Sequence, residues 1–493
     1  MGVVDRRLTV RRPTFGWAFL LPVVLSGCLA DNDLLVAETP ALPATFAAAA
    51  AAHPAEPVRE WPRVFGSSEL VSLTRSAEAE NLDIAAATAR IRQADAAAQI
   101  ASAGLFPQLS GTEDASRALS PGTLRFKDPP FSGSVGNRFS LGLSASYVVD
   151  LFGRNRSIAE SANLGAEASR FDRDAVAVAT VASVANLYLQ LLAAQDRLRL
   201  AGENIRTAEQ VLEAIRARLA VGTATELDVA QQESVLANER ASVPALDQTI
   251  QQTRNLLAVL VGRTPESMRV IGGSLDRLAI PRVQAGVPSQ LLLRRPDIAA
   301  AELRLSSEKA SVEAARLAFF PTISLTGGVS LESLVLKNLF RPEALAASLA
   351  QGLTQPIFSG GSLEGQLEQA RGRQVELLQD YRKAILTALS DVENALIAIQ
   401  QTQSHEKLQL VVVASARRAY QITQVRLREG TIDVVTLLNT QQTLFQAQDQ
   451  LTQVRLQKFA AYVSLFQALG GGWARDTVVM ADGVIPAPWE AGR

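Results

Sequence analysis

The chain has 493 residues, and its 48 lysines and arginines balance 49 aspartates and glutamates to give a formal net charge of −1. Because the chain has no basic excess, we expect no nucleic-acid partner. Its 2 histidines and 1 cysteine are too few for a metal site or an internal disulfide, so we predict no metal and no other cofactor. These counts also argue against enzymes that depend on histidine or cysteine.

The amino-terminal residues predict a lipoprotein signal peptide over 1–27. Four arginines precede the apolar run Phe15–Leu25, which is too short to span a membrane but suits the core of a signal peptide. The run ends in Leu25–Cys28, a sequence that resembles a bacterial lipobox. The resemblance implies that Cys28 becomes the first mature residue and carries acyl chains such as palmitate. An ordinary secretory signal with an incidental cysteine is the alternative.

Residues 28–60 predict a lipidated, extended tether, because they hold an alanine tract and 4 prolines rather than a periodic pattern. Leu29, and not an aspartate, follows the cysteine. In lipoproteins of this kind that residue implies sorting to the outer membrane.

No other apolar run approaches the length of a membrane-spanning helix, so a mature chain that crosses a membrane must use β-strands. Apolar and polar residues alternate in four segments, which are 105–112, 137–151, 322–332 and 345–357. Such alternation is typical of a strand with one lipid face and one wet face, although a half-buried soluble sheet gives the same pattern. Loops near 113–136 and 333–344 would join the strands into two hairpins. Four strands cannot close a barrel, so the strands either form a soluble sheet or share one barrel with other chains.

Long stretches without proline, rich in Ala, Leu, Gln, Glu and Arg, predict long helices. The stretch 158–220 alone would measure about 95 Å at ~1.5 Å per residue. After Asp433, leucines recur every seven residues at Leu437, Leu444 and Leu451, as in coiled-coil packing. Glutamines between them predict a neutral polar face, which suits either ordinary surface or a water-filled lumen. They are Gln441, Gln446, Gln448, Gln453 and Gln457.

The chain is an internal duplication. Arg218–Thr223 matches Arg426–Thr431 at an offset of 208 residues, and upstream the offset becomes 214 because the hairpin loops differ in length. Each half reads as a helix, a β-hairpin and two long helices. The predicted divisions are a first repeat at 61–262, an equatorial linker region at 263–295, a second repeat at 296–472 and a C-terminal tail at 473–493.

Four motifs resemble the outer-membrane factor family of the TolC/OprM/NodT type, which supplies the exit ducts of tripartite efflux pumps. They are Leu293–Ile298, Phe319–Pro321, Arg428–Thr431 and Ala468–Trp473. With the lipobox, the hairpins and the duplication, the resemblance covers nearly all of the mature chain. It implies a mainly α fold with a membrane β-hairpin portion. Long helices would build a periplasmic α-barrel, and 4 strands per protomer would contribute to a twelve-stranded trimeric β-barrel.

The resemblance also implies a homotrimer that exports small molecules such as drugs and toxic compounds. Its expected partners are a periplasmic adaptor (membrane fusion) protein, an inner-membrane pump, for which the RND type is a candidate, and outer-membrane lipid. The protein would lie in the cell outer membrane, lipid-anchored, with a long periplasmic portion. A type I secretion duct and a lipid-anchored periplasmic coiled-coil scaffold without a channel are the alternatives. We predict no enzyme and no catalytic residue, because no phosphate-binding P-loop occurs and carboxylates accompany arginine and lysine at helical spacing.

Two turns between long helices are the predicted gate and adaptor-binding tip. Gly222 and Gly430 suit the left-handed conformation that ends a helix. In the family such turns close the channel and meet the adaptor. Asp228 matches a family position at the constriction, although Thr225 and Asp228 also have the spacing of a capping box.

Acidic residues near these turns predict a ring of negative charge in a trimer. Asp433 could either face the pore or cap a helix. Repeated three times together with Glu226 and Asp228, it would favour cations.

The second tip departs from the best-known family pattern. Thr436 and Asn439 stand where some members have aspartates, and Ile432 replaces a basic residue. We therefore expect a closed tip held mainly by helix packing and Asp228. The candidate partners of Asp228 are Arg426 and Arg428.

Arg294–Asp297 predicts architecture rather than a ligand site. Pro296 would begin a helix, and Asp297 would lie favourably at its positive end. The two arginines could pair with acidic groups in the equatorial region.

Overall fold

The computed structural model describes residues 43, 45–47, 60–120, 134–281 and 286–473. The predicted signal peptide, Cys28, most of the predicted tether and the tail beyond Trp473 lie outside these residues. The described residues all belong to the unit Thr39–Arg493, and the arrangement below is that of this unit alone.

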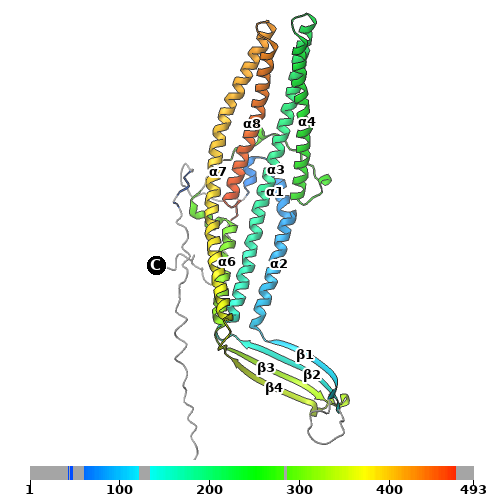
Figure 1. The fold of residues 1–493 in the computed structure, drawn as a ribbon, viewed down its shortest axis with the longest axis vertical. Coiled ribbons are helices and arrows are strands. Elements are labelled where there is room, and N and C mark those ends of the chain that lie inside the picture. The colour runs from blue at the N-terminus through cyan, green and yellow to red at the C-terminus, as the bar shows by residue number, and fades with distance from the viewer. Residues whose placement is uncertain (1–42, 44, 48–59, 121–133, 282–285, 474–493) are drawn as a thin grey trace, which may run out of the picture. The chain divides into compact units, whose positions relative to one another are not determined.

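The two halves of the chain consist of the same series of elements (Figure 1). The first half holds α1 (Ser68–Glu80), α2 (Leu82–Ser102), β1 (Gln108–Ser120), β2 (Ser134–Val149), α3 (Arg154–Ala220) and α4 (Glu226–Leu260). The second holds α5 (Leu291–Arg294), α6 (Pro296–Leu317), β3 (Thr322–Ser333), β4 (Leu345–Thr354), α7 (Ser362–Arg428) and α8 (Val434–Ala468). The lengths repeat as well, since α3 and α7 each have 67 residues and α4 and α8 each have 35.

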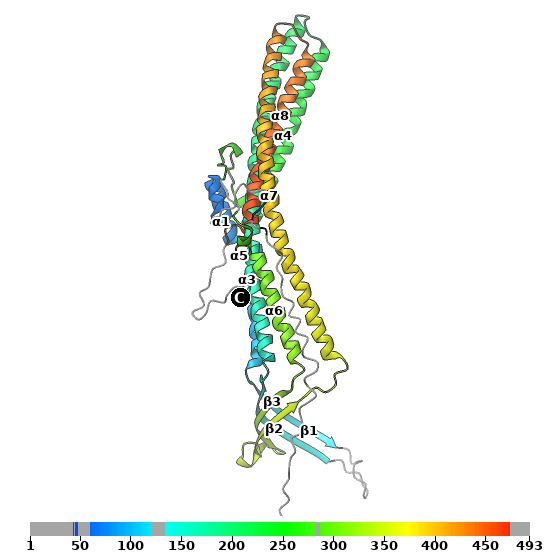
Figure 2. The same ribbon diagram turned by 90° about the vertical axis from the view of Figure 1, so that its left-hand side faces the viewer.

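The long helices run between the sheet and two helical turns. A helix of 67 residues spans about 100 Å at ~1.5 Å per residue. The hairpins α3–α4 and α7–α8 lie side by side (Figures 1 and 2), and α3 packs against both α4 and α8. The sheet and the helical turns therefore lie at opposite ends of α3 and of α7.

The main core joins the middle of α3 to α8 and to a short 3-10 helix, Trp61–Phe65. The Trp61 ring stacks on Phe466 at a centroid distance of 5.1 Å. Leu437 and Leu444 are buried, so two of the three heptad leucines pack in the interior of the helical bundle.

One glutamine of the predicted polar face does not lie on the surface. Gln441 is fully buried, and neither its amide nitrogen nor its amide oxygen has a hydrogen-bond partner within the described residues. Gln446 and Gln457 are exposed as expected. The sequence pattern failed at Gln441 because the buried face of α8 is wider than the line of heptad leucines and includes this position.

One apolar stretch was also underestimated. An 18-residue window of α3 has a mean hydropathy of 1.7 and is long and apolar enough, by length and composition alone, to cross a membrane. The prediction that no apolar run after the signal peptide approaches the length of a membrane-spanning helix was therefore wrong. Half of the window is buried inside the protein, where Val184 and Leu189 belong to the main core. This packing explains the apolar character of the buried half.

The four strands form one antiparallel sheet in the order β1-β2-β3-β4. The predicted loop at 113–136 was too long, because β1 continues to Ser120 and pairs Glu113 with Leu141. Residues 113–120 have polar side chains on both faces, mixed with Ala115, Ala118 and Leu119, so they show no clear alternation. The backbone pairing with β2 keeps them extended. At the other edge β4 ends at Thr354 rather than at 357.

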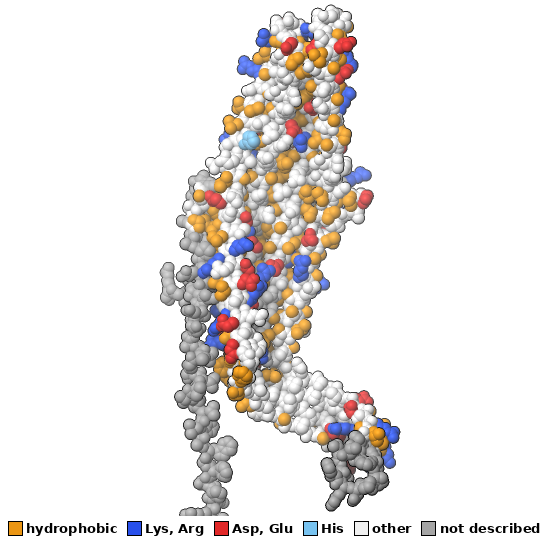
Figure 3. Space-filling view, in the orientation of Figure 1, with side chains coloured by type: hydrophobic (Ala, Val, Ile, Leu, Met, Phe, Trp, Pro, Cys, Tyr) orange, Lys and Arg blue, Asp and Glu red, His pale blue; other side chains and the backbone are white. Residues whose placement is uncertain are grey.

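Apart from Val148, the register places the large apolar side chains of all four strands on one face. Leu109 pairs with Ala145, Leu143 with Val329, and Gly327 with Leu349, and these positions share that face. Serines and threonines occupy the other face, where the Ser110 and Ser144 hydroxyls are 2.8 Å apart. In Figure 3 few charged side chains lie over the middle of the sheet, and they gather at one end of the strands.

Within the described part of the chain, nothing covers the apolar face. Leu349 is 89% exposed, Leu109 is 73% exposed and Leu143 is 58% exposed. A soluble half-buried sheet would bury this face against helices, so the exposure distinguishes the two interpretations that the sequence left open.

Candidate functional site

The two helical turns fold almost identically. Gly222 has a φ of 75° and Gly430 a φ of 71°, the left-handed conformation that the sequence predicted for both. At the first turn, the backbone N–H and the hydroxyl of Thr223 donate to the Arg218 carbonyl at 2.8 and 3.1 Å. At the second, Thr431 makes the same two bonds to Arg426 at 2.9 and 3.0 Å.

The start of α4 is a capping box. The backbone N–H and the hydroxyl of Thr225 both donate to the Asp228 carboxylate at 2.8 Å, and the Asp228 N–H donates back to the Thr225 hydroxyl at 3.3 Å. The carboxylate of Asp228 thus satisfies a helix end. Among the described residues it forms no ion pair with Arg426 or Arg428, both of which are exposed.

The start of α8 is capped by Asp433. Its carboxylate accepts hydrogen bonds from the Thr436 N–H at 2.8 Å and from the Thr436 hydroxyl. These bonds hold the pKa of Asp433 below its usual value. Glu226 and Asn439 are exposed, in the first and second turns of their helices, so the single chain does not gather the predicted acidic residues into one cluster.

Helix packing holds the two turns together within the chain. A cluster that includes Ile215, Leu427, Val434 and Leu437 fills the space between α3, α7 and α8. Burial raises the pKa of the nearby Tyr420 to about 12, so its hydroxyl stays neutral and accepts a bond from Gln424 at 2.7 Å.

Sequence reasoning missed the side chain that joins the two turns. Arg218, in the last turn of α3, donates from its guanidinium to the carbonyl oxygen of Leu427 at the end of α7. Arg218 and Leu427 are 209 positions apart in the chain. The only sequence signal for Arg218 was the repeat alignment, which places an arginine at the same position of both turns, Arg218 and Arg426.

The Arg294–Asp297 motif is a structural junction, as predicted. The Arg295 side chain is only 12% exposed and forms ion pairs with Asp297 at 2.7 Å and Asp391 at 2.9 Å. It also donates to the Ala468 carbonyl at the end of α8. Burial lowers the pKa of Arg295, but the two carboxylates outweigh burial and raise it above the usual value.

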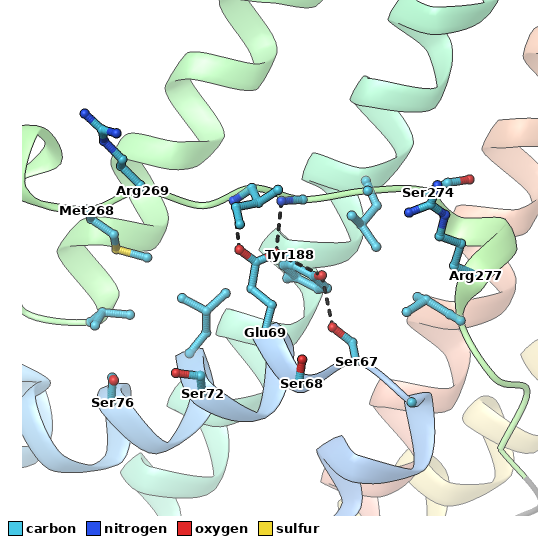
Figure 4. A pocket seen from close by; sticks show the side chains of 18 of the residues that line it. Ser67, Ser68, Glu69, Ser72, Ser76, Tyr188, Met268, Arg269, Ser274 and Arg277 are labelled. Carbon is cyan, nitrogen blue, oxygen red and sulfur yellow. Dashed lines mark hydrogen bonds between the residues drawn. The ribbon is translucent and has the colours of Figure 1, made fainter.

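A pocket of about 690 Å³ lies between α1 and the linker near 263–278 (Figure 4). The Glu69 carboxylate accepts from the N–H groups of Ile271 at 2.8 Å and Gly272 at 2.9 Å, and from the Tyr188 hydroxyl at 3.2 Å. Ser67 lies 3.0 Å from the same hydroxyl. These bonds are internal, so they fasten the linker to α1 and α3. The described residues also contain no cluster of His, Cys, Asp or Glu that could hold a metal.

Residues 73–263 and 287–471 match the family described as outer membrane efflux protein. The chain belongs to this family. It is similar to the pyoverdine export outer membrane protein OpmQ of Pseudomonas aeruginosa, with 39% identity over 435 residues, which cover 87% of this chain and 90% of that protein.

Solved structures agree with this assignment. The outer-membrane channel OprN superposes with a TM-score of 0.82 at 28% identity, covering 88% of this chain and 98% of that one. The open state of the MtrE outer membrane channel of Neisseria gonorrhoeae gives 0.79 at 30% identity, covering 89% and 97%. The present protein is therefore an outer-membrane efflux channel with a long periplasmic helical portion and not an enzyme.

Proposed function

We propose that three copies of the chain form one duct, which exports small molecules across the outer membrane as the exit component of a tripartite pump. The observation that carries the proposal is the four-stranded sheet with an exposed apolar face. In lipid the outer edges of β1 and β4 need partners, since unpaired backbone groups are costly there. Three sheets of 4 strands joined edge to edge close a barrel of a size that membrane barrels use.

The long helices support the periplasmic part of the duct. Each chain supplies two hairpins of matching length, so three chains supply six similar hairpins around one axis. The helical turns, at the end remote from the sheet, are the proposed docking site for a periplasmic adaptor protein, with an inner-membrane pump beyond it. Cys28 is the proposed lipid attachment site, and the lipobox sequence is its support.

The lipid contact of the sheet has a direct test. We expect Leu349→Arg to lower the stability of the membrane-inserted protein by about 2–4 kcal/mol, because the arginine would face lipid hydrocarbon in the middle of β4. Ser348→Arg, one residue earlier on the polar face, is the matched control and should insert normally. The measurement is the yield of folded protein in outer-membrane fractions. Equal yields for the two variants would contradict a lipid-facing sheet.

The acidic residues of the tip are proposed to set the cation preference of the closed end. Asp228→Asn can keep both hydrogen bonds from Thr225, so the melting temperature should not change while cation preference in planar bilayers falls. Asp228→Ala should in addition lose about 0.5–1 kcal/mol of stability with the capping box. An unchanged cation preference in Asp228→Asn would leave this residue with a capping role only.

A further inference from the structure

The contact between Arg218 and Leu427 is one half of a repeated pattern. It joins the end of α3 in the first hairpin to the end of α7 in the second, and the Arg218 side chain is partly buried there. The Leu427 carbonyl also accepts from the Gly430 N–H at 3.0 Å within its own turn. A charged donor from another hairpin thus adds to a helix end that is already closed.

Both residues of this contact have counterparts in the other repeat at the offset of 208 residues. Arg426 corresponds to Arg218, and Leu219 corresponds to Leu427. The turns themselves are equivalent, since the Gly222 N–H donates to the Leu219 carbonyl at 2.9 Å as Gly430 does to Leu427. The same donor and the same acceptor therefore exist twice in each chain.

Only one of the two pairs is made within the chain. Leu427 is buried and Leu219 only partly so, whereas Arg218 is partly buried and Arg426 is exposed. The Arg426 carbonyl accepts from Thr431, but among the described residues the Arg426 guanidinium has no hydrogen-bond or ion-pair partner. The guanidinium of the second repeat is therefore exposed, on a side of the hairpin that no described residue of this chain covers.

The same side of α7 is apolar and exposed. Leu408 is 67% exposed, Val411 is 62% and Ile422 is 48%. At about 100° per residue, these positions lie within roughly 60° of Arg426 around the helix axis. Exposed apolar residues in a row on a periplasmic helix need a partner, and the contact of α3 with α8 is the template for one.

We propose that Arg426 donates to the carbonyl oxygen of Leu219 of the partner subunit. The inference rests on the trimer proposed above. Three contacts of Arg218 within chains would then alternate with three contacts of Arg426 between chains around the closed tip. The second contact completes between subunits the pattern that Arg218 completes within one.

Two chains with different tags, one carrying Leu219→Cys and the other Arg426→Cys, test the contact when they are co-expressed. No native cysteine other than Cys28 occurs. Oxidation of the assembled trimer should give a disulfide between the two tags, which only contact between subunits allows. Trimers of native mass without this disulfide would overturn the contact and leave the duct intact. Absence of trimers would overturn the duct and the contact together.

Conductance gives an independent readout in the intact trimer. Arg426→Gln and Arg218→Gln should each shift the tip toward the open state about tenfold, because each loses a charge-assisted hydrogen bond. Arg417→Gln removes the same charge from the opposite side of α7, nine residues earlier, and is the matched control. An equal rise in conductance in the control would show a general charge effect and would overturn the contact.

Discussion

Gly470→Ala should prevent the second repeat from closing and strongly reduce the amount of folded protein. A Cβ at this position would lie 1.9 Å from the carbonyl oxygen of Arg294, and the φ of 94° is left-handed. The obstacle is backbone, so the end of α8 must move away from the junction of α5 and α6. We expect a cost on the order of 4 kcal/mol or more, from overpacking and left-handed strain together.

A control separates the clash from the strain. Gly360 also has a positive φ of 63°, but no atom of the described residues lies within 4 Å of a Cβ added there. Gly360→Ala should therefore lose only about 1–2 kcal/mol of stability. Gly262→Ala, the equivalent of Gly470 in the first repeat, would place its Cβ 2.2 Å from the Glu80 carbonyl and should behave like Gly470→Ala. Thermal unfolding of the purified protein is the measurement, and equal melting temperatures for Gly470→Ala and Gly360→Ala would contradict the account.

Arg295→Leu should be the next most damaging change. The substitution leaves the carboxylates of Asp297 and Asp391 without their cation and the Ala468 carbonyl without this donor. Breaking a fully buried ion pair would be more destabilising, but both carboxylates here are 43% exposed. We therefore expect the free energy of unfolding to fall by about 2–4 kcal/mol. The measurement is the shift in melting temperature relative to the unmodified protein.

The repeat supplies a rescue for this variant. Asn81 occupies the same place in the first half, where it accepts from the Asp83 and Ile84 N–H groups at 2.9 and 3.0 Å and donates to the Leu260 carbonyl at 2.8 Å. Arg295→Asn should therefore be less destabilising than Arg295→Leu, although both remove the charge. If the two variants melt at the same temperature, the ion pairs and not the contact with the end of α8 hold this junction.

Periodicity predicted the elements well because it records which face of each element is apolar. The alternation over 322–332 gave a strand that the structure has at Thr322–Ser333, and the long proline-free stretch gave α3. It failed at 113–120, where polar residues on both faces leave no pattern, and at Gln441, where a polar residue lies in a buried interface. The capping box at Thr225 and Asp228 was readable because its partners are three residues apart.

The sequence by itself determined that the chain has few residues for metal binding or catalysis, with 2 histidines, 1 cysteine and a net charge of −1. It also determined the two repeats and their glycine turns. Those features are local in the chain or are set by composition. Only the tertiary structure decided that the apolar face of the sheet is uncovered and that Arg218 reaches Leu427. It likewise showed that Arg295 gathers two carboxylates and a helix end. Contacts between different long helices, such as those of Arg218 with Leu427 and of Arg295 with Asp391, depend on how the helices pack, and that geometry leaves no periodic trace in the sequence.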